Sequence, residues 1–405
     1  MNDSDCRMPS LKVYLSKISC LSIKISRTFM LIKHVRKSEI KWRNPPKSDI
    51  VIYDQDNAKV FYEYLGDYSV TEVSITGKTL YFFVLLKSIL RSKFWKLPVQ
   101  TYVEEFLKST QPRLIMTFTD NNPPFYELSN KFTSATTLLI QNGWRSNTPS
   151  LFSVDHLSRN YYVDYMLMFG HSIGSFYKEN IGGNIVCIGS LRSNKIPKSI
   201  ERNNKTVLFV SQVSKYPTAE SMYLLDDGRT VTEEQFYAAE MTLLPNLFSW
   251  CLSNSFKLQI CLRSTSIDEK RFYEQILVGP GWEFVEKSNT VSSYELVDEA
   301  EIVVAIDSTL GLESLGRDNK TAFFNYRKLS VNNWPDFFWP ADLPTSGPFW
   351  TDVDSYSEVE RVLKGLSAAT DEDWINLVRL HQPNLIGWDE GNKILMSTIN
   401  SILKT

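Results

Sequence analysis

The chain has 405 residues, of which 43% are hydrophobic, and a formal net charge of −2. This length exceeds the size at which a single hydrophobic core stops growing, so two domains are expected. The composition excludes an intrinsically disordered chain, and the charge excludes a globally basic nucleic-acid binder.

The first 47 residues differ in charge from the rest. Eleven lysines and arginines but only three acidic residues lie between Met1 and Lys47. Basic residues interrupt this segment every few positions, so it lacks the continuous apolar stretch of a secretory signal peptide. No apolar run in the sequence has the length needed to span a bilayer. We therefore expect a cytoplasmic protein with a basic leader over residues 1–47.

Strand-like and helix-like segments alternate through the first half. Strands are predicted at 48–54, 69–75, 112–120, 134–143 and 164–170, and helices at 57–66, 79–97 and 99–111. This alternation is typical of a doubly wound sheet. The polar, proline-containing stretch 190–206 is the predicted domain boundary.

The same alternation restarts after that stretch. Strands are predicted at 205–212, 256–263, 282–286, 301–307 and 320–326, and helices at 233–253, 268–277, 292–300, 309–317, 356–369 and 389–403. The sequence therefore predicts an α/β fold with two Rossmann-like domains facing a cleft. They occupy residues 48–195 and 205–370, and closing helices occupy 371–405.

The five cysteines are scattered. Cys6, Cys20, Cys187, Cys251 and Cys261 include no C-x-x-C pair, so neither a disulfide framework nor a zinc site is indicated. No cluster of histidine, cysteine and carboxylate residues has metal-ligand spacing, so no built-in metal is predicted.

Polar and glycine residues follow the predicted strands of the first half. Ligands of open α/β sheets bind beyond the carboxyl ends of the strands, so these residues are candidates for a cleft. They are Asp120, Asn121, Asn122, Gln141, Asn142, Gly143, His171, Gly189 and Ser190. Each of them can also be explained as a turn former, but their recurrence at four strand ends favours a cleft.

The second half repeats the pattern. The candidates there are Ser211, Gln212, Arg263, Ser264, Asp307, Ser308, Thr309, Gly311 and Glu313. A helix that begins with hydroxyl residues near a glycine suits phosphate oxygens, and Arg263 can neutralise them. Glu313, in the second turn of that helix, is placed to accept from ribose hydroxyls. The competing interpretation is that Ser308 or Thr309 is an ordinary helix cap.

Several of these segments, among them TFTDNNPPFY, LLIQNGWRS and EIVVAIDSTLGLESLGRDNKTAFF, resemble bacterial surface-carbohydrate (O-antigen and capsule) biosynthesis proteins of the GT-B glycosyltransferase group. The resemblance covers roughly residues 48–330 and extends distantly to Kdo transferases, which use a CMP-activated acidic sugar. It implies a nucleotide-sugar donor in the C-terminal half, an acceptor in the N-terminal half and no cofactor beyond that co-substrate. By position, the resemblance implies that Ser308, Thr309, Gly311 and Glu313 bind the donor. The His-Pro pair that related enzymes often carry is replaced here by Arg263 and Ser264.

The resemblance also implies a reaction. Asp120 or His171 would deprotonate the acceptor hydroxyl if the reaction inverts configuration, while Arg263 and the helix start at 308–311 stabilise the leaving phosphate. A growing glycan on a lipid carrier is the implied acceptor. The basic leader and the cationic, apolar stretch 79–97 are candidates for contact with the inner membrane surface.

Other classes remain open from the sequence. A sugar-nucleotide epimerase or a polyol-phosphate transferase can use the same two-domain cleft, although the C-terminal half has no histidine before His381 to serve an epimerase. A non-catalytic partner in polysaccharide assembly is the third class.

Overall fold

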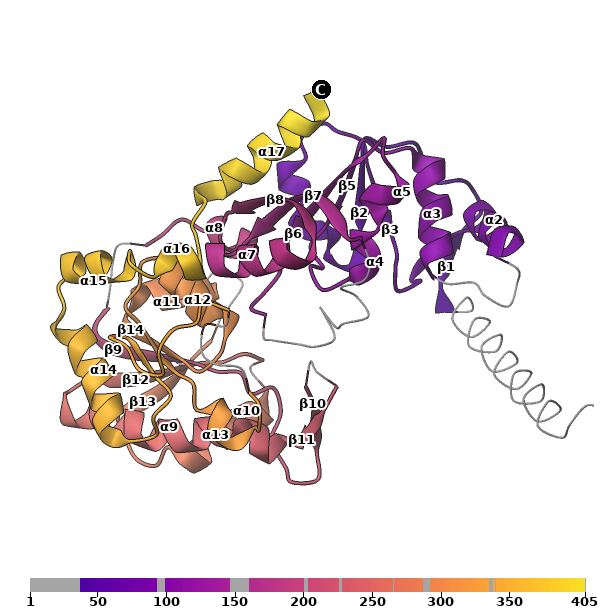
Figure 1. Cartoon of the computed structure of the whole chain (residues 1–405). Helices are drawn as coiled ribbons and strands as arrows, with labels where there is room; N and C mark the ends of the chain where they lie inside the picture. The colour runs from indigo at the N-terminus through magenta and orange to yellow at the C-terminus, as the bar shows by residue number, and fades with distance from the viewer. Residues whose placement is uncertain are drawn as a thin grey trace, which may run out of the picture. The chain divides into compact units, whose positions relative to one another are not determined.

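The computed structural model describes residues 37–92, 99–145, 160–199, 203–225, 228–264, 266–286, 292–334, 338 and 340–404. These residues form an α/β fold with two six-stranded sheets, of strand order β3-β2-β5-β6-β7-β8 and β13-β12-β9-β14-β15-β16 (Figure 1). Every pairing described within the two sheets is parallel. The predicted fold class, with two Rossmann-like halves, is therefore confirmed.

Contacts divide the chain into two compact units, and the first comprises Met1–Phe118, Phe132–Thr137 and Ile402–Thr405. Its core strand, β2, has Ile50, Val51 and Ile52 completely buried. Its elements are β1 (Glu39–Lys41), β2 (Ile50–Tyr53), η1 (Gln55–Val60), η2 (Tyr62–Tyr64), β3 (Val70–Val73), β4 (Thr79–Tyr81), α2 (Phe82–Ser92), α3 (Val99–Thr110) and β5 (Leu114–Thr117).

Two predicted helices of this unit differ from the structure. The segment 57–66 was expected to form one helix but forms the two short 3-10 helices η1 and η2, the first capped by the Asp54 carboxylate, which accepts from the Asp56 amide. The segment 79–97 was expected to be helical throughout, but Thr79–Tyr81 is the strand β4. It pairs with β1, a partner about forty residues away that local pattern could not indicate. Residues 93–97 lie outside the described part, as do residues 1–36 of the leader.

The second unit comprises Thr119–Lys131 and Leu138–Ser401. Its first part carries α4 (Pro123–Tyr126), α5 (Leu128–Lys131), most of β6 (Thr136–Ile140), β7 (Tyr162–Met168), α7 (His171–Asn180), β8 (Gly182–Cys187) and α8 (Leu191–Asn194). Each of β6, β7 and β8 leads into one of the predicted strand-end segments.

The C-terminal sheet lies in the same unit. Its strands are β9 (Asn203–Val210), β12 (Lys257–Cys261), β13 (Trp282–Val285), β14 (Ala300–Ala305), β15 (Thr321–Phe324) and β16 (Trp350–Thr351). The helices in this part of the chain are α9 (Glu233–Ser253), α10 (Ile267–Ile276), α11 (Ser293–Glu299), α12 (Thr309–Gly316), α13 (Arg327–Ser330), α14 (Tyr356–Ala368), α15 (Asp371–Val378) and α16 (Gln382–Leu385), and the hairpin of β10 (Met222–Leu224) and β11 (Thr230–Thr232) follows β9. After α16 come η4 (Glu390–Asn392) and α17 (Lys393–Lys404), whose last residues, from Ile402 on, belong to the first unit. The start of α9 at Glu233 is fixed by a capping box between Thr232 and Gln235.

The compact units do not divide at the predicted boundary, residues 190–206. Part of this stretch is the helix α8, and its side chains bind residues of the C-terminal half: the Asn194 amide donates to Asn392, and Lys198 pairs with Asp318. The Ser199 amide likewise donates to Asp298. A polar, proline-containing composition is compatible with such an anchored segment as well as with a linker.

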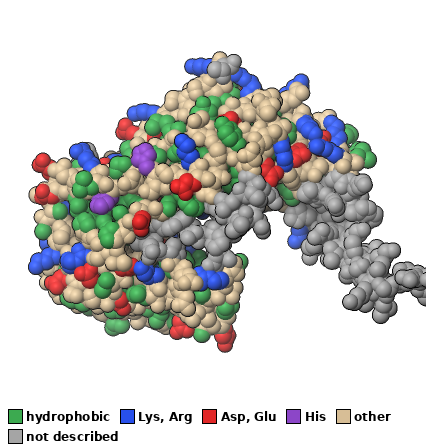
Figure 2. Space-filling model, viewed as in Figure 1, with side chains coloured by type: hydrophobic (Ala, Val, Ile, Leu, Met, Phe, Trp, Pro, Cys, Tyr) green, Lys and Arg blue, Asp and Glu red, His purple; other side chains and the backbone are tan. Residues whose placement is uncertain are grey.

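Charged side chains of both signs are scattered among apolar ones over the visible face (Figure 2). Within the described ranges, no helix is both long enough and apolar enough to cross a bilayer.

Candidate functional site

The strand order of the C-terminal sheet defines where a ligand is expected. From β9 the chain adds β12 and β13 on one side, then returns to add β14, β15 and β16 on the other side. The change of direction between β9 and β14 is a topological switch point, the place where open α/β sheets bind ligands. Gln212 follows β9, Asp307 follows β14, and Arg263 follows the neighbouring β12. The predicted donor residues therefore meet at the switch point and beside it.

The helix α12 begins at this switch point. Ser308 is its cap, and the Ser308 hydroxyl accepts from the Leu310 amide at 3.3 Å. Gly311 lies on the side of α12 that faces the sheet, where a Cβ atom would come within 2.5 Å of the Ala305 Cβ. A glycine here lets the helix pack closely on β14, as in dinucleotide-binding folds. The helix N-terminus carries a partial positive charge suited to phosphate oxygens.

A buried arginine, Arg327, organises the base of the switch point. Its Nε donates to Asp307 at 2.7 Å, and one terminal nitrogen reaches Glu240 at 2.9 Å and the side chain of Gln212 at 3.1 Å. Burial raises the pKa of Glu240, and Arg327 opposes that shift. Asp307 and Gln212 are thus held in place by one cation. Sequence reasoning missed Arg327, although it directly follows a predicted strand, 320–326, and the strand-end rule would have found it.

A second buried carboxylate, Glu269, shapes the loop after β12. It accepts from the backbone amides of Arg263 and Ser264, each at 2.8 Å, and from the Ser211 hydroxyl. The Arg263 side chain is exposed, and its guanidinium donates to the Gln212 carbonyl at 2.8 Å. Glu269 therefore fixes the backbone of this loop and leaves the cation of Arg263 at the surface.

The segment after β6 contacts the start of α12. The Trp144 amide donates to the Thr309 hydroxyl at 3.1 Å, and Gly143 faces the same hydroxyl. Gln141 braces this segment, because its side chain donates to the Gly143 carbonyl at 2.9 Å and accepts from the Phe169 amide at 2.8 Å. Two predicted sites, one from each half of the sequence, are thereby brought together.

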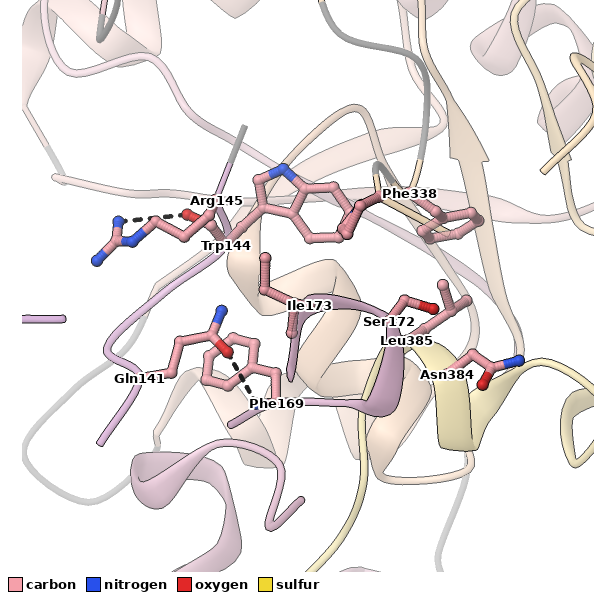
Figure 3. Close-up of a pocket in the computed structure, with 10 residues that line it drawn as sticks. Gln141, Trp144, Arg145, Phe169, Ser172, Ile173, Phe338, Asn384 and Leu385 are labelled. Atoms are coloured by element: carbon pink, nitrogen blue, oxygen red, sulfur yellow. Dashed lines mark hydrogen bonds between the residues drawn. The ribbon is translucent and has the colours of Figure 1, made fainter. Parts of the chain in front are cut away.

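A small pocket lies beside this contact (Figure 3). The rings of Trp144 and Phe338, with centroids 6.2 Å apart, form one wall, and Ser172 and Asn384 supply polar groups. The remaining lining residues are Gln141, Arg145, Phe169, Ile173, Pro340 and Leu385. Of the lining residues, only Gln141 was a candidate from the sequence.

Asp120 is completely buried and its carboxylate is fully engaged. Arg145 donates to both carboxylate oxygens, the Tyr177 hydroxyl donates to Oδ2 at 3.0 Å, and the Asn142 amide donates to Oδ1 at 3.2 Å. Burial raises the pKa of Tyr177 well above its usual value, with the adjacent Asp120 adding to the shift. This network holds the segment after β6 and leaves no free carboxylate face to receive a proton from a substrate.

His171 has a different environment. It is the first residue of α7, its side chain is exposed, and its Nδ1 lies 3.2 Å from the Cys187 sulfur. It lines an open hollow that shares Ser172, Pro340 and Asn384 with the small pocket. Burial raises the pKa of the Cys187 thiol to about 11, so at neutral pH this sulfur is not a charged partner for the histidine.

Glu313 was predicted to contact a ribose, but its carboxylate is occupied by groups of the protein itself. It is buried, accepts from the Ser190 hydroxyl, and accepts from the Tyr294 hydroxyl at 3.1 Å. Burial raises its pKa to about 7, against the opposing effect of these hydrogen bonds. Glu313 therefore links α12 to the end of β8 and to α11.

The remaining candidates lie at a close backbone crossing, at a helix cap and on the surface. Gly189 has a φ of +74°, and a Cβ atom there would come within 2.1 Å of the Gly387 carbonyl oxygen, so only glycine fits this crossing. Asn122 precedes α4 as its cap residue, and Asn121 is exposed.

Solved structures similar to this chain share its architecture. A protein from Listeria monocytogenes described as a "putative UDP-N-acetylglucosamine 2-epimerase" aligns with a TM-score of 0.52 and 10% identity, over 88% of this chain and 97% of its own. A glycosyltransferase from Rickettsia africae aligns with a TM-score of 0.49 and 11% identity, over 89% of this chain and 99% of its own. The wall teichoic acid polymerase TagF aligns with a TM-score of 0.47 and 11% identity, over 88% of this chain and 89% of its own. At these identities the likeness concerns the fold alone.

The sequence places the chain in a family. A family model described as "putative O-antigen biosynthesis protein" matches residues 138–403, well over half of the chain, and the protein belongs to this family. A search of curated proteins found no match. The matched residues span nearly all of the second compact unit, which contains the switch point and the pocket.

Proposed function

We propose that this protein is a glycosyltransferase that moves a sugar from a nucleotide-sugar donor to a growing O-antigen-type glycan. One observation carries the proposal: the switch point between β9 and β14 brings together the α12 N-terminus, the fixed side chains of Gln212 and Asp307, and the exposed cation of Arg263. A helix N-terminus and a cation suit phosphate oxygens, and fixed hydrogen-bonding groups suit a nucleoside.

The donor's phosphates are assigned to the start of α12. In this proposal Ser308, Thr309 and the first backbone amide of α12 receive the phosphate oxygens, while Gly311 lets the helix pack closely on β14. Arg263 neutralises the charge that develops as the sugar leaves. Glu313 serves as a positioning residue for α12, because its carboxylate is occupied by Ser190 and Tyr294.

The space beside Trp144 is too small for a sugar ring, so the acceptor is assigned to the adjoining open hollow at His171. The polar side chains of Ser172, Glu179 and Asn384 line this pocket together with the Phe176 ring. Polar groups beside an aromatic ring suit a sugar, whose faces are apolar and whose edges carry hydroxyls. Of the two predicted bases, we retain His171, because it is exposed next to this pocket, whereas the Asp120 carboxylate is saturated by Arg145 and Tyr177. We propose no cofactor besides the nucleotide sugar, and CMP-Kdo is one donor to test.

The first experiment measures donor binding by the shift in thermal unfolding with UDP-, CDP-, GDP- and CMP-linked sugars, since a ligand that binds only the folded state stabilises it. Ser308→Ala should abolish the shift. Ser355→Ala is the matched control, because Ser355 also caps a helix, α14, by accepting from a backbone amide. Each substitution should cost about 1 kcal/mol of stability, but only the first should remove the ligand response.

The second experiment separates the cation and the reaction class. Arg263→Ala should weaken donor binding. Arg271→Ala, which removes a different exposed arginine, located on α10, should leave donor binding unchanged. Sugar transfer that requires an acceptor supports the proposal. Conversion of the donor to an epimer without any acceptor would instead identify an epimerase, and failure of every nucleotide to bind would identify a non-catalytic partner.

A further inference from the structure

The helix α2 in the first compact unit exposes apolar side chains on its solvent face. Phe83 is 43% exposed, Leu86 42% and Leu90 76%, and these positions follow one another on one side of the helix. Trp42, just after β1, is 71% exposed. We call these four residues the α2 apolar surface. Adjacent large apolar residues exposed in this way mark an interaction site more often than a scattered set does.

The α2 apolar surface is part of an ordered element. The opposite side of α2 is packed, because Val84 and Ser88 are completely buried. The Trp42 ring lies 4.5 Å from the Phe82 ring, which ties the residue to the start of the helix. A second helix, α3, is joined to α2 by an ion pair of 2.6 Å between Arg91 and Glu105. The exposed apolar residues are therefore not the result of a helix that lacks a packed side.

The two segments that form this surface are rich in basic residues. Residues 37–43 and 82–92 contain Lys37, Lys41, Arg43, Lys87 and Arg91 and a single acidic residue, Glu39. Arg91 is paired with Glu104 and Glu105 of α3, so the positive charge of the surface comes from the other four cations. Lys87 is exposed on the same side of α2 as Leu86 and Leu90. At the end of the molecule where Figure 1 labels α2, Figure 2 shows apolar side chains next to basic ones, with some acidic side chains among them.

We propose that the α2 apolar surface docks the protein on an anionic lipid bilayer. An amphipathic helix with apolar residues flanked by lysine and arginine lies in the interfacial plane, with its apolar side chains among the acyl chains and its cations at the phosphates. Charge complementarity favours this occupant over a second copy of the chain, whose own α2 would present the same basic residues. The surface lies outside residues 138–403, the part that the family model matches.

The proposed membrane contact uses only the α2 apolar surface and does not require the donor site. It would give the proposed glycosyltransferase access to an acceptor carried on a lipid. A vesicle-binding experiment contains no nucleotide, so its failure and a failure of the proposed function are distinguishable.

The test is co-sedimentation of the full chain with vesicles of phosphatidylcholine alone or mixed with phosphatidylglycerol. We expect binding to the anionic vesicles that falls as salt is raised towards about 1 M, where charges are screened within about 3 Å. The double variant Phe83→Ser/Leu90→Ser should bind the anionic vesicles at least about tenfold more weakly than the wild type, because two apolar anchors are lost. Its matched control is Val278→Ser/Leu380→Ser, which alters two residues that are 80% and 72% exposed in the second unit.

The charge is tested separately. Lys87→Gln should reduce binding to anionic vesicles about fivefold, the equivalent of about 1 kcal/mol, and Lys364→Gln on α14 should not. Equal binding of the wild type to neutral and anionic vesicles would overturn the proposal, as would wild-type affinity in the Phe83/Leu90 variant. A protein that ignores vesicles but forms a dimer disrupted by the same variant would show that a second copy occupies the surface.

Discussion

Replacing Glu313 by glutamine tests whether this carboxylate titrates near neutral pH in the folded protein. Its pKa is raised by burial from the ordinary 4.5 to about 7. Between these two values the folded protein holds a proton that the unfolded chain releases. The stabilising effect of the protonated group is therefore complete below about pH 4.5 and is lost as the pH rises through 7.

The size of the effect follows from the difference in pKa. At 1.36 kcal/mol per pKa unit, the full loss is about 3 kcal/mol, of which about 2–3 kcal/mol falls between pH 5 and pH 8. Glutamine has nearly the same shape, carries no charge, and keeps an oxygen that can accept from Ser190 and Tyr294. The stability of Glu313→Gln relative to the wild type should therefore rise by about 2–3 kcal/mol between pH 5 and pH 8.

The assay is urea unfolding followed by tryptophan fluorescence at several pH values. Glu358→Gln is the control, because hydrogen bonds, the strongest from Arg361, lower the pKa of Glu358 to about 2. Both its folded and its unfolded pKa then lie below pH 5, so its stability relative to the wild type should be nearly constant over the same range. A constant difference for Glu313→Gln as well would refute the raised pKa and the role of burial behind it.

Two further predictions concern packing and buried charge. Gly311→Ala should destabilise the protein by about 1–3 kcal/mol, because the new methyl group collides with β14. Gly365→Ala in α14 meets nothing within 4 Å and should stabilise by about 0.4–1 kcal/mol, and equal effects of the two in urea unfolding would contradict the packing argument. Arg327→Met should cost about 3–5 kcal/mol, because it leaves the carboxylate of Glu240 buried without its cation. Adding Glu240→Gln to Arg327→Met should recover part of that loss, and a double variant as unstable as the sum of the singles would show that the two groups are not coupled.

Much of the fold was available from local sequence pattern. Every strand of the C-terminal sheet except β16 was predicted, and the helix at 233–253 has the predicted bounds. The central strands β9 and β14 and the neighbouring β15 were recognisable because buried strands of a parallel sheet are rich in apolar residues. The short elements β4, β10 and β11 were missed, since three paired residues leave no periodicity.

The sequence by itself determined which residues lie at strand ends: a polar residue that directly follows a buried run reaches the carboxyl edge wherever that strand lies in the sheet. Only the tertiary structure decided which of these ends are neighbours, because strand order depends on crossovers that no local pattern records. It placed β14 beside β9 and so created the switch point at Asp307. It also decided the partners of the carboxylates. Asp120 accepts hydrogen bonds from Arg145, and Glu313 accepts one from Ser190, 123 residues away. Burial and hydrogen bonding therefore gave each carboxylate a role that its position in the sequence did not specify.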